Sequence, residues 1–262
     1  MNICTANHAL SIEVRKFIEH VGDAKEESIT DYLVWKWREL DKRFNYLRVT
    51  PFNHDEESST TGADFDLELW LVGRSFQISL AVQAKKFIKR NDSYVKRLRY
   101  PNGSKAQMDK LLAYAKSRGS SPFYFIYTLP EVTTIPMCNG KNGNTPLVEE
   151  GAVFMADAHV MEEYADGTHG KRISRDQLLS SANPFHCMFC CPFAGSNSYF
   201  SHYFPGVLGQ VPQRKVELPS YVQRLLDSQK GSNPEGVTLE PAERERLRAF
   251  RVVGVYDMRN DA

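Results

Sequence analysis

Long hydrophobic runs are missing from this sequence, and so is a charged leader followed by an apolar core. A membrane-spanning helix needs about 18 or more consecutive apolar residues, and a secretory signal needs a basic segment before its apolar one. The first absence argues against a membrane-spanning protein and the second against a secreted one. We therefore expect a cytoplasmic protein that has no membrane partner.

Cysteine is scarce, with 5 residues in 262, and three of these crowd into residues 187–191. An odd number in this arrangement does not fit a disulfide framework, so a reducing compartment is expected. Cys187 and Cys190 lie three positions apart and follow His186, which is the spacing of half a zinc site. The sequence has no second pair of this kind, and buried free cysteines explain the residues equally well. Both interpretations stay open.

Net charge is nearly absent as well, at +1, and the sequence has no internal repeat or low-complexity segment. A chain without overall positive charge can contact nucleic acid only through local basic patches. The glycine-rich stretch 139–144 lacks the Lys-Ser/Thr pair of a phosphate-binding loop. A composition of 42% hydrophobic and 25% charged residues is typical of globular proteins. With no convincing linker, we expect a single domain over 1–262.

Helical and strand patterns are present, and they are clearest in the first half of the chain. Apolar residues such as Ile29, Leu33 and Trp37 recur at helical spacing, whereas other segments alternate with a period of two. These patterns predict helices over 25–45 and 104–119 and strands over 46–52, 63–72, 76–84 and 122–130. The order helix, strand, strand, strand, helix, strand predicts an α/β fold with a mixed sheet flanked by helices.

Patterns in the second half of the chain are weaker. We expect residues 25–130 to form the core of the fold and residues 131–262 to add further elements to it. A strand that runs into a short helix fits 151–164, and a last strand fits 250–258. Two further helices fit 216–230 and 240–249.

The predicted hairpin carries polar residues at regular positions. Its first strand alternates apolar residues with Asp64, Asp66 and Glu68, and its second strand carries Gln83 and Lys85. Residues two apart in a strand share a face, so Gln83 and Lys85 point the same way, beside a strand that opens with Asp64. A buried amide bonded to backbone and a solvent-facing lysine are the ordinary alternatives for these two residues.

The residue types of this hairpin suit one kind of chemistry. Carboxylate and amide oxygens, with the Ala84 carbonyl between the two motif residues, are hard ligands of the kind that Mg²⁺ prefers. A neighbouring ammonium can position a water molecule or stabilise charge that builds on a phosphate. Hydrolysis of a phosphodiester needs such a set.

These motifs resemble those of the PD-(D/E)xK nuclease superfamily, which has the restriction-endonuclease-like fold. "GAD" at 62–64 carries the family aspartate, and "QAK" at 83–85 is the third motif in its Gln-x-Lys form, as in methylation-dependent restriction endonucleases. Glu27 matches the acidic residue that many members bring in from the first helix. Gln107 matches the glutamine that some members carry on the next helix. The predicted order of elements agrees, and the whole is similar to a bacterial family of such nucleases.

The resemblance implies a metal-dependent endonuclease with the site residues Glu27, Asp64, Gln83, Lys85 and Gln107. Glu27, Asp64 and Gln83 would hold Mg²⁺ or Mn²⁺, and Lys85 would position the attacking water. The resemblance further implies DNA as substrate, a role in antiviral defence, and a second copy or a defence-system protein as partner. Glutamine at the third motif leaves one negative charge fewer than an acidic residue would. A catalytically weak or inactive nucleic-acid-binding or effector protein on the same fold is therefore the alternative.

The acidic residues also have simpler interpretations. Asp64 could cap a turn, and Asp66 is the second choice for the metal ligand. Glu68 shares their face and is expected to be solvated. Glu27 could serve only as favourable charge at a helix N-terminus, a role that its neighbour Glu26 could fill as well.

A basic run follows the third motif directly, over residues 85–100, with Asp92 as its single acid. Cations in this position could contact phosphates on either side of a cleavage point. A solvated charged loop is the ordinary alternative. The residues predicted to contact nucleic acid are Lys86, Lys89, Arg90, Lys96, Arg97 and Arg99.

Overall fold

The structure is a computed structural model, and the part of the chain that it describes is discontinuous. It describes residues 3–44, 47–51, 65–74, 77–88, 98, 107–130, 151–170, 172–189, 218–227, 240–247, 249–257 and 259. All structural statements below concern these residues.

Seven strands of the described chain form one mixed sheet, in the order β1-β7-β2-β3-β4-β5-β6. β2 and β3 form the antiparallel hairpin that the sequence predicts, and β3 and β4 are parallel. The predicted α/β class with a mixed sheet flanked by helices is thus confirmed. The strands are β1 Leu47–Pro51, β2 Phe65–Val72, β3 Gln77–Lys86, β4 Ser121–Tyr127, β5 Val153–Asp157, β6 Asn183–Pro184 and β7 Phe250–Asp257.

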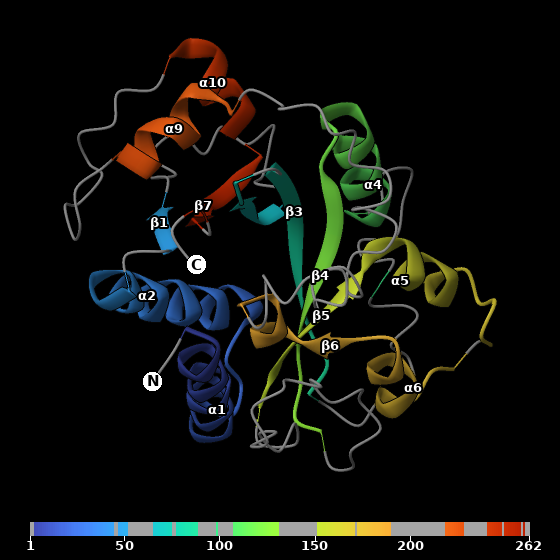
Figure 1. The fold of residues 1–262 in the computed structure, drawn as a ribbon. Coiled ribbons are helices and arrows are strands. Elements are labelled where there is room, and N and C mark those ends of the chain that lie inside the picture. The colour runs from blue at the N-terminus through green and yellow to red at the C-terminus, as the bar shows by residue number, and fades with distance from the viewer. Residues whose placement is uncertain are drawn as a thin grey trace.

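Helices cover both faces of the sheet (Figure 1). The first face is covered by α1 Ile3–Val21, α2 Glu26–Phe44 and the short 3-10 helix η2 Phe185–Phe189. The second face is covered by α4 Gln107–Arg118, α5 Ala158–Ala165, α6 Arg175–Ser180, α9 Ser220–Asp227 and α10 Pro241–Leu247. Among the described residues, no helix has the length and apolar character that crossing a membrane requires.

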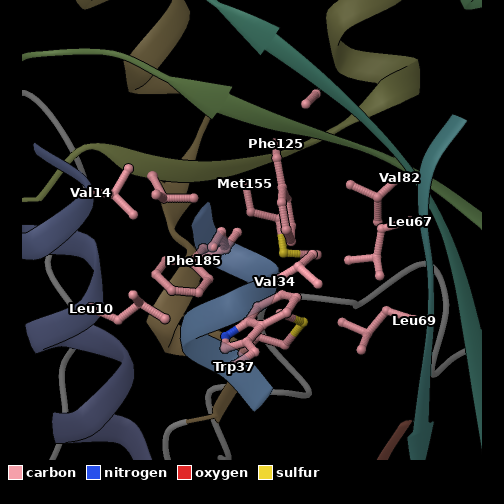
Figure 2. Packing of buried hydrophobic residues seen from close by; sticks show 14 of the residues in the cluster. Leu10, Val14, Val34, Trp37, Leu67, Leu69, Val82, Phe125, Met155 and Phe185 are labelled. Atoms are coloured by element: carbon pink, nitrogen blue, oxygen red, sulfur yellow. The ribbon is translucent and has the colours of Figure 1, made fainter. Parts of the chain in front are cut away.

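The core of the first face joins α1, α2 and the sheet around one tryptophan (Figure 2). Trp37 of α2 is fully buried, and its ring centroid lies 6.3 Å from that of Phe125 and 6.1 Å from that of Phe185. Its indole Nε1 donates a hydrogen bond of 2.8 Å to Asn7 Oδ1 of α1. A buried indole N–H needs such a partner, so this bond fixes α1 against α2.

Two elements lie where the sequence patterns did not lead us to expect them. Helix α1 precedes the predicted core and packs against α2 and η2. Strand β7 comes from the end of the chain, yet it lies between β1 and β2, antiparallel to the first and parallel to the second. The segment expected to elaborate the core therefore supplies an interior strand of the sheet. The pairing partners of a nearly continuous apolar strand depend on the rest of the sheet, which its own sequence does not encode.

Candidate functional site

The candidate site lies at the end of β3, the strand that carries the predicted third motif. β3 is paired on both edges, with β2 and β4, and helices cover both faces of the sheet. Its side chains are consequently buried along most of its length, and Gln83 and Lys85 are each 6% exposed. Because they lie two apart, they share the face of β3 that looks toward α4.

Lys85 is held by side chains from two different helices. Its Nζ donates a hydrogen bond of 2.7 Å to Gln107 Oε1, the side chain that opens α4. It also lies 3.8 Å from Glu26 Oε2, at the start of α2. A buried ammonium is costly unless it has hydrogen-bond partners and a counter-charge, and these two residues supply both. The predicted residues Lys85 and Gln107 are therefore brought together directly.

The acidic residue that reaches the site is Glu26, whereas the resemblance pointed to Glu27. Glu26 Oε1 accepts a hydrogen bond of 3.0 Å from the backbone N–H of Lys86, and its other oxygen faces Lys85. Glu27 is exposed to solvent. Consecutive residues of a helix point about 100° apart, so only one of the two can face the end of β3. The sequence offers two adjacent glutamates and does not say which one that is.

The start of α2 is anchored beside this carboxylate. Lys86 Nζ donates a hydrogen bond of 2.5 Å to the Ala24 carbonyl and lies 3.8 Å from Asp23. Thr30 of α2 bonds the hydroxyl of Tyr127, at 2.9 Å, and Tyr127 is the register partner of Lys86 on β4. Lys86 was predicted to contact nucleic acid, and in the structure its ammonium holds the loop before α2.

Several predicted residues lie outside the described part of the chain. They are Asp64, which was predicted to be a metal ligand, and the basic residues Lys89, Arg90, Lys96, Arg97 and Arg99. For Asp66 the structure describes the backbone within β2, and its side chain is outside the description. The roles assigned to these residues remain predictions.

Glu68 is buried, so the expectation of a solvated carboxylate is wrong. Its residue is 0% exposed, and both of its oxygens are bonded. Tyr221 OH of α9 donates to Oε2 at 2.7 Å, and Arg246 Nη2 of α10 donates to Oε1 at 3.1 Å. The partners come from the C-terminal helices that cover this face of β2. The sequence around Glu68 does not indicate that these partners exist.

The oxygen donors near Lys85 are of the kind that magnesium binds, but the described residues do not supply enough of them to hold the ion. The Glu26 carboxylate and the Gln83 amide are oxygen donors of the type that Mg²⁺ takes. The described residues contain no group of three or more His, Cys, Asp or Glu side chains that could hold a metal ion. A full set of ligands therefore needs oxygen from outside the described residues, and Asp64 is the predicted source.

The described residues do not complete a set of zinc ligands around the cysteine cluster. Cys187 is buried and forms no disulfide, Cys4 of α1 is disulfide-bonded, and Cys190 lies outside the description. The disulfide was not expected from the count of cysteines. His186 is buried, and burial together with the nearby His8 lowers the pKa of its imidazole to about 3.

This is an α/β protein in which a central strand ends in a buried lysine and amide, with a helix-borne carboxylate beside them. The chain belongs to a family of unknown function, DUF6615, whose model matches residues 3–253. The match runs from α1 into β7, so the N-terminal helix and the first half of the C-terminal strand are part of the family's pattern. No curated protein and no solved structure matches the chain.

Proposed function

We propose that this protein is a metal-dependent nuclease that hydrolyses phosphodiester bonds of DNA. The observation that carries the proposal is the setting of Lys85, a buried ammonium held between Gln107 and Glu26 at the end of a central strand. Lysines are rarely buried unless they are paired, and a buried lysine with ordered partners beside oxygen donors is typical of a site that handles negative charge. The resemblance to the PD-(D/E)xK nucleases supports the same assignment.

Each residue of the site has a defined task in this proposal. Gln107 fixes the Lys85 side chain through a bond of 2.7 Å, so that the ammonium is oriented before substrate arrives. Lys85 then holds the attacking water or stabilises the negative charge on the phosphate. Glu26, Gln83 and the predicted ligand Asp64 would hold Mg²⁺ or Mn²⁺. When bound, such an ion neutralises phosphate charge and lowers the pKa of a coordinated water.

A second candidate function is a nucleic-acid-binding or effector protein that cleaves weakly or not at all. Gln83 favours it, because an amide brings one negative charge fewer than a carboxylate to the site. Among the described residues, only Glu26 places a carboxylate next to Lys85. A role in defence, and a partner that is either a second copy or a defence-system protein, rest on the resemblance alone.

Plasmid nicking in Mg²⁺ or Mn²⁺, with and without EDTA, tests the nuclease proposal. Lys85→Ala and Asp64→Asn are expected to lower cleavage by roughly 100-fold or more, as the loss of an electrostatic stabiliser does in other enzymes. Lys116→Ala is the matched control, because Lys116 lies on the same helix as Gln107 but is exposed. Circular dichroism checks that the variants fold.

The outcomes separate the two candidates. Metal-dependent cleavage that Lys85→Ala abolishes and Lys116→Ala preserves supports the nuclease. Cleavage by Lys85→Ala within a few-fold of wild type removes the assigned mechanism. DNA binding in Ca²⁺ without cleavage in Mg²⁺ or Mn²⁺ supports the binding or effector protein.

A further inference from the structure

The hydroxyl of Thr30 on α2 is bonded to two neighbours at once. It donates a hydrogen bond of 3.1 Å to the Glu26 carbonyl, one turn earlier in the helix. It is also bonded, at 2.9 Å, to the hydroxyl of Tyr127, the last residue of β4. A threonine hydroxyl has one proton to donate. Because that proton goes to the Glu26 carbonyl, the Tyr127 hydroxyl is the donor of the second bond, and the two bonds form a chain from β4 to Glu26.

Tyr127 is also joined to the strand that carries Lys85. Its carbonyl accepts a hydrogen bond of 2.8 Å from the backbone N–H of Phe87, which lies two positions after Lys85. Thr128 Oγ1 donates a bond of 2.8 Å to the carbonyl of the same Phe87. The ends of β3 and β4 are therefore fixed to each other. Tyr127 thus contacts β3 through its backbone and α2 through its hydroxyl.

The position of Thr30 in α2 connects this bond to the Glu26 carboxylate. Residues four apart in a helix lie on the same face, so Thr30 and Glu26 both face the ends of β3 and β4. A bond that holds Thr30 to β4 therefore fixes the rotation of α2 about its own axis. That rotation decides whether Glu26 or Glu27 meets β3, because consecutive residues of a helix point about 100° apart.

We infer that Thr30 and Tyr127 are positioning residues for the candidate site: their hydrogen bond sets the rotation of α2 that brings Glu26 to Lys85 and to the Lys86 backbone. Thr30 is 3% exposed and Tyr127 is fully buried, so both act through Glu26 and not on the substrate. Displacements of about 1 Å are enough to lower catalysis strongly. The catalytic consequence rests on the proposed function, whereas the placement of Glu26 does not.

The test removes single hydroxyl groups from the full-length chain. Tyr127→Phe and Thr30→Val each remove one partner of the bond and keep the shape of the side chain, and Thr30→Ser keeps the hydroxyl. Tyr124→Phe is the matched control. Tyr124 is as buried as Tyr127 and lies on the same strand, but it packs in the core of the opposite face. Its hydroxyl makes no hydrogen bond among the residues that the structure describes.

Hydrogen exchange of the Lys86 amide, followed by NMR, is the first readout, because it requires no activity. This amide donates the bond of 3.0 Å to Glu26 Oε1. We expect it to exchange roughly fivefold faster in Tyr127→Phe and in Thr30→Val, as loss of one hydrogen bond predicts, while amides in the middle of β3 keep the wild-type rate. Thr30→Ser and Tyr124→Phe should match wild type.

The double variant Thr30→Val with Tyr127→Phe checks that the two residues act through one bond. We expect its Lys86 amide to exchange no faster than in Thr30→Val alone. Three results overturn the inference. They are a wild-type rate at Lys86 in both single variants, equal acceleration along the whole of β3, and additive effects in the double variant.

Plasmid cleavage is the second readout and depends on the proposed function. We expect kcat of Tyr127→Phe and Thr30→Val to fall roughly tenfold while KM for DNA stays unchanged, and Thr30→Ser to stay within about twofold of wild type. Residues that served only global stability would leave kcat unchanged at temperatures well below Tm, so a wild-type kcat overturns the catalytic part of the inference. If wild type itself does not cleave DNA, the proposed nuclease function fails, and the exchange rates alone decide whether Thr30 and Tyr127 position Glu26.

Discussion

Two adjacent glutamates at the start of α2 provide a matched pair of substitutions, Glu26→Ala and Glu27→Ala. Both residues lie in the first turn of the helix, so each variant loses a similar interaction with the helix N-terminus, of about 0.3–1 kcal/mol. Only Glu26 accepts the hydrogen bond of 3.0 Å from the Lys86 backbone and lies 3.8 Å from Lys85 Nζ. The difference between the two variants therefore isolates the contacts of Glu26 with β3.

The size of that difference follows from the two contacts. A hydrogen bond to a charged group contributes about 1.5–3 kcal/mol to the free energy of unfolding. The Glu26 side chain is 32% exposed, so solvent screens its ion pair with Lys85, which we count at no more than about 1 kcal/mol. We expect Glu26→Ala to lower the free energy of unfolding by about 1.5–4 kcal/mol more than Glu27→Ala. For a chain of this size the Tm values should then differ by roughly 3–16 °C.

Thermal unfolding followed by circular dichroism measures the stability difference, and plasmid nicking in Mg²⁺ measures function. We expect Glu26→Ala to lose roughly 100-fold in cleavage rate and Glu27→Ala to stay within a few-fold of wild type. Glu26→Gln separates the two effects, since its amide oxygen keeps the hydrogen bond and loses the charge. Equal Tm values for the two alanine variants, or loss of cleavage in Glu27→Ala alone, would refute the placement of Glu26 in the site.

Three further variants test other contacts of the molecule. Gln107→Leu removes the acceptor of the buried Lys85 ammonium, so we expect a loss of about 1–3 kcal/mol in thermal melts and at least tenfold slower nicking; wild-type values in both assays would contradict the bond. Replacing Lys96, Arg97 and Arg99 together with Ala should flatten the salt dependence of DNA binding by about two to three units, at about 0.9 per phosphate contact. Fluorescence anisotropy in Ca²⁺ measures this slope, and an unchanged slope identifies a solvated loop. Glu243→Gln probes acid stability. Burial opposes ionisation of Glu243, but hydrogen bonds from Ser220, the Glu240 backbone and Arg224 outweigh it, and the pKa is lowered from the ordinary 4.5. The ionised Glu243 carboxylate therefore adds to the free energy of unfolding above its ordinary pKa. This stabilisation is lost as the pH falls through the lowered pKa, where the carboxylate takes up a proton. The Tm difference between wild type and Glu243→Gln should shrink as the pH falls through the lowered pKa. A Tm difference that does not change with pH would exclude a role of Glu243 in acid stability.

The sequence by itself determined the local elements and the residues that share a face. Strands were predicted over 63–72 and 76–84, and the structure has them at Phe65–Val72 and Gln77–Lys86. A period of two is a local property of a strand, so it also placed Gln83 and Lys85 on one side. The strand that runs into a helix near 151–164 is likewise found, as β5 and α5. Helix α1 could have been predicted in the same way, from the spacing of Leu10, Val14 and Ile18, which are all buried.

The surroundings of these residues were decided by the tertiary structure alone. Glu68 occupies a position in the alternation that suits a solvated carboxylate, yet its partners Tyr221 and Arg246 lie 153 and 178 residues away in the chain. Glu26 and Glu27 are equivalent in sequence, and the angle at which α2 meets the end of β3 selects the first. The position of β7 between β1 and β2 depends in the same way on segments far apart in the chain. Periodicity fixes which side chains point together, because it is set by the backbone of a few residues. Burial and charge pairing depend on which distant segments pack against a given face of the sheet. Those contacts form only in the folded protein.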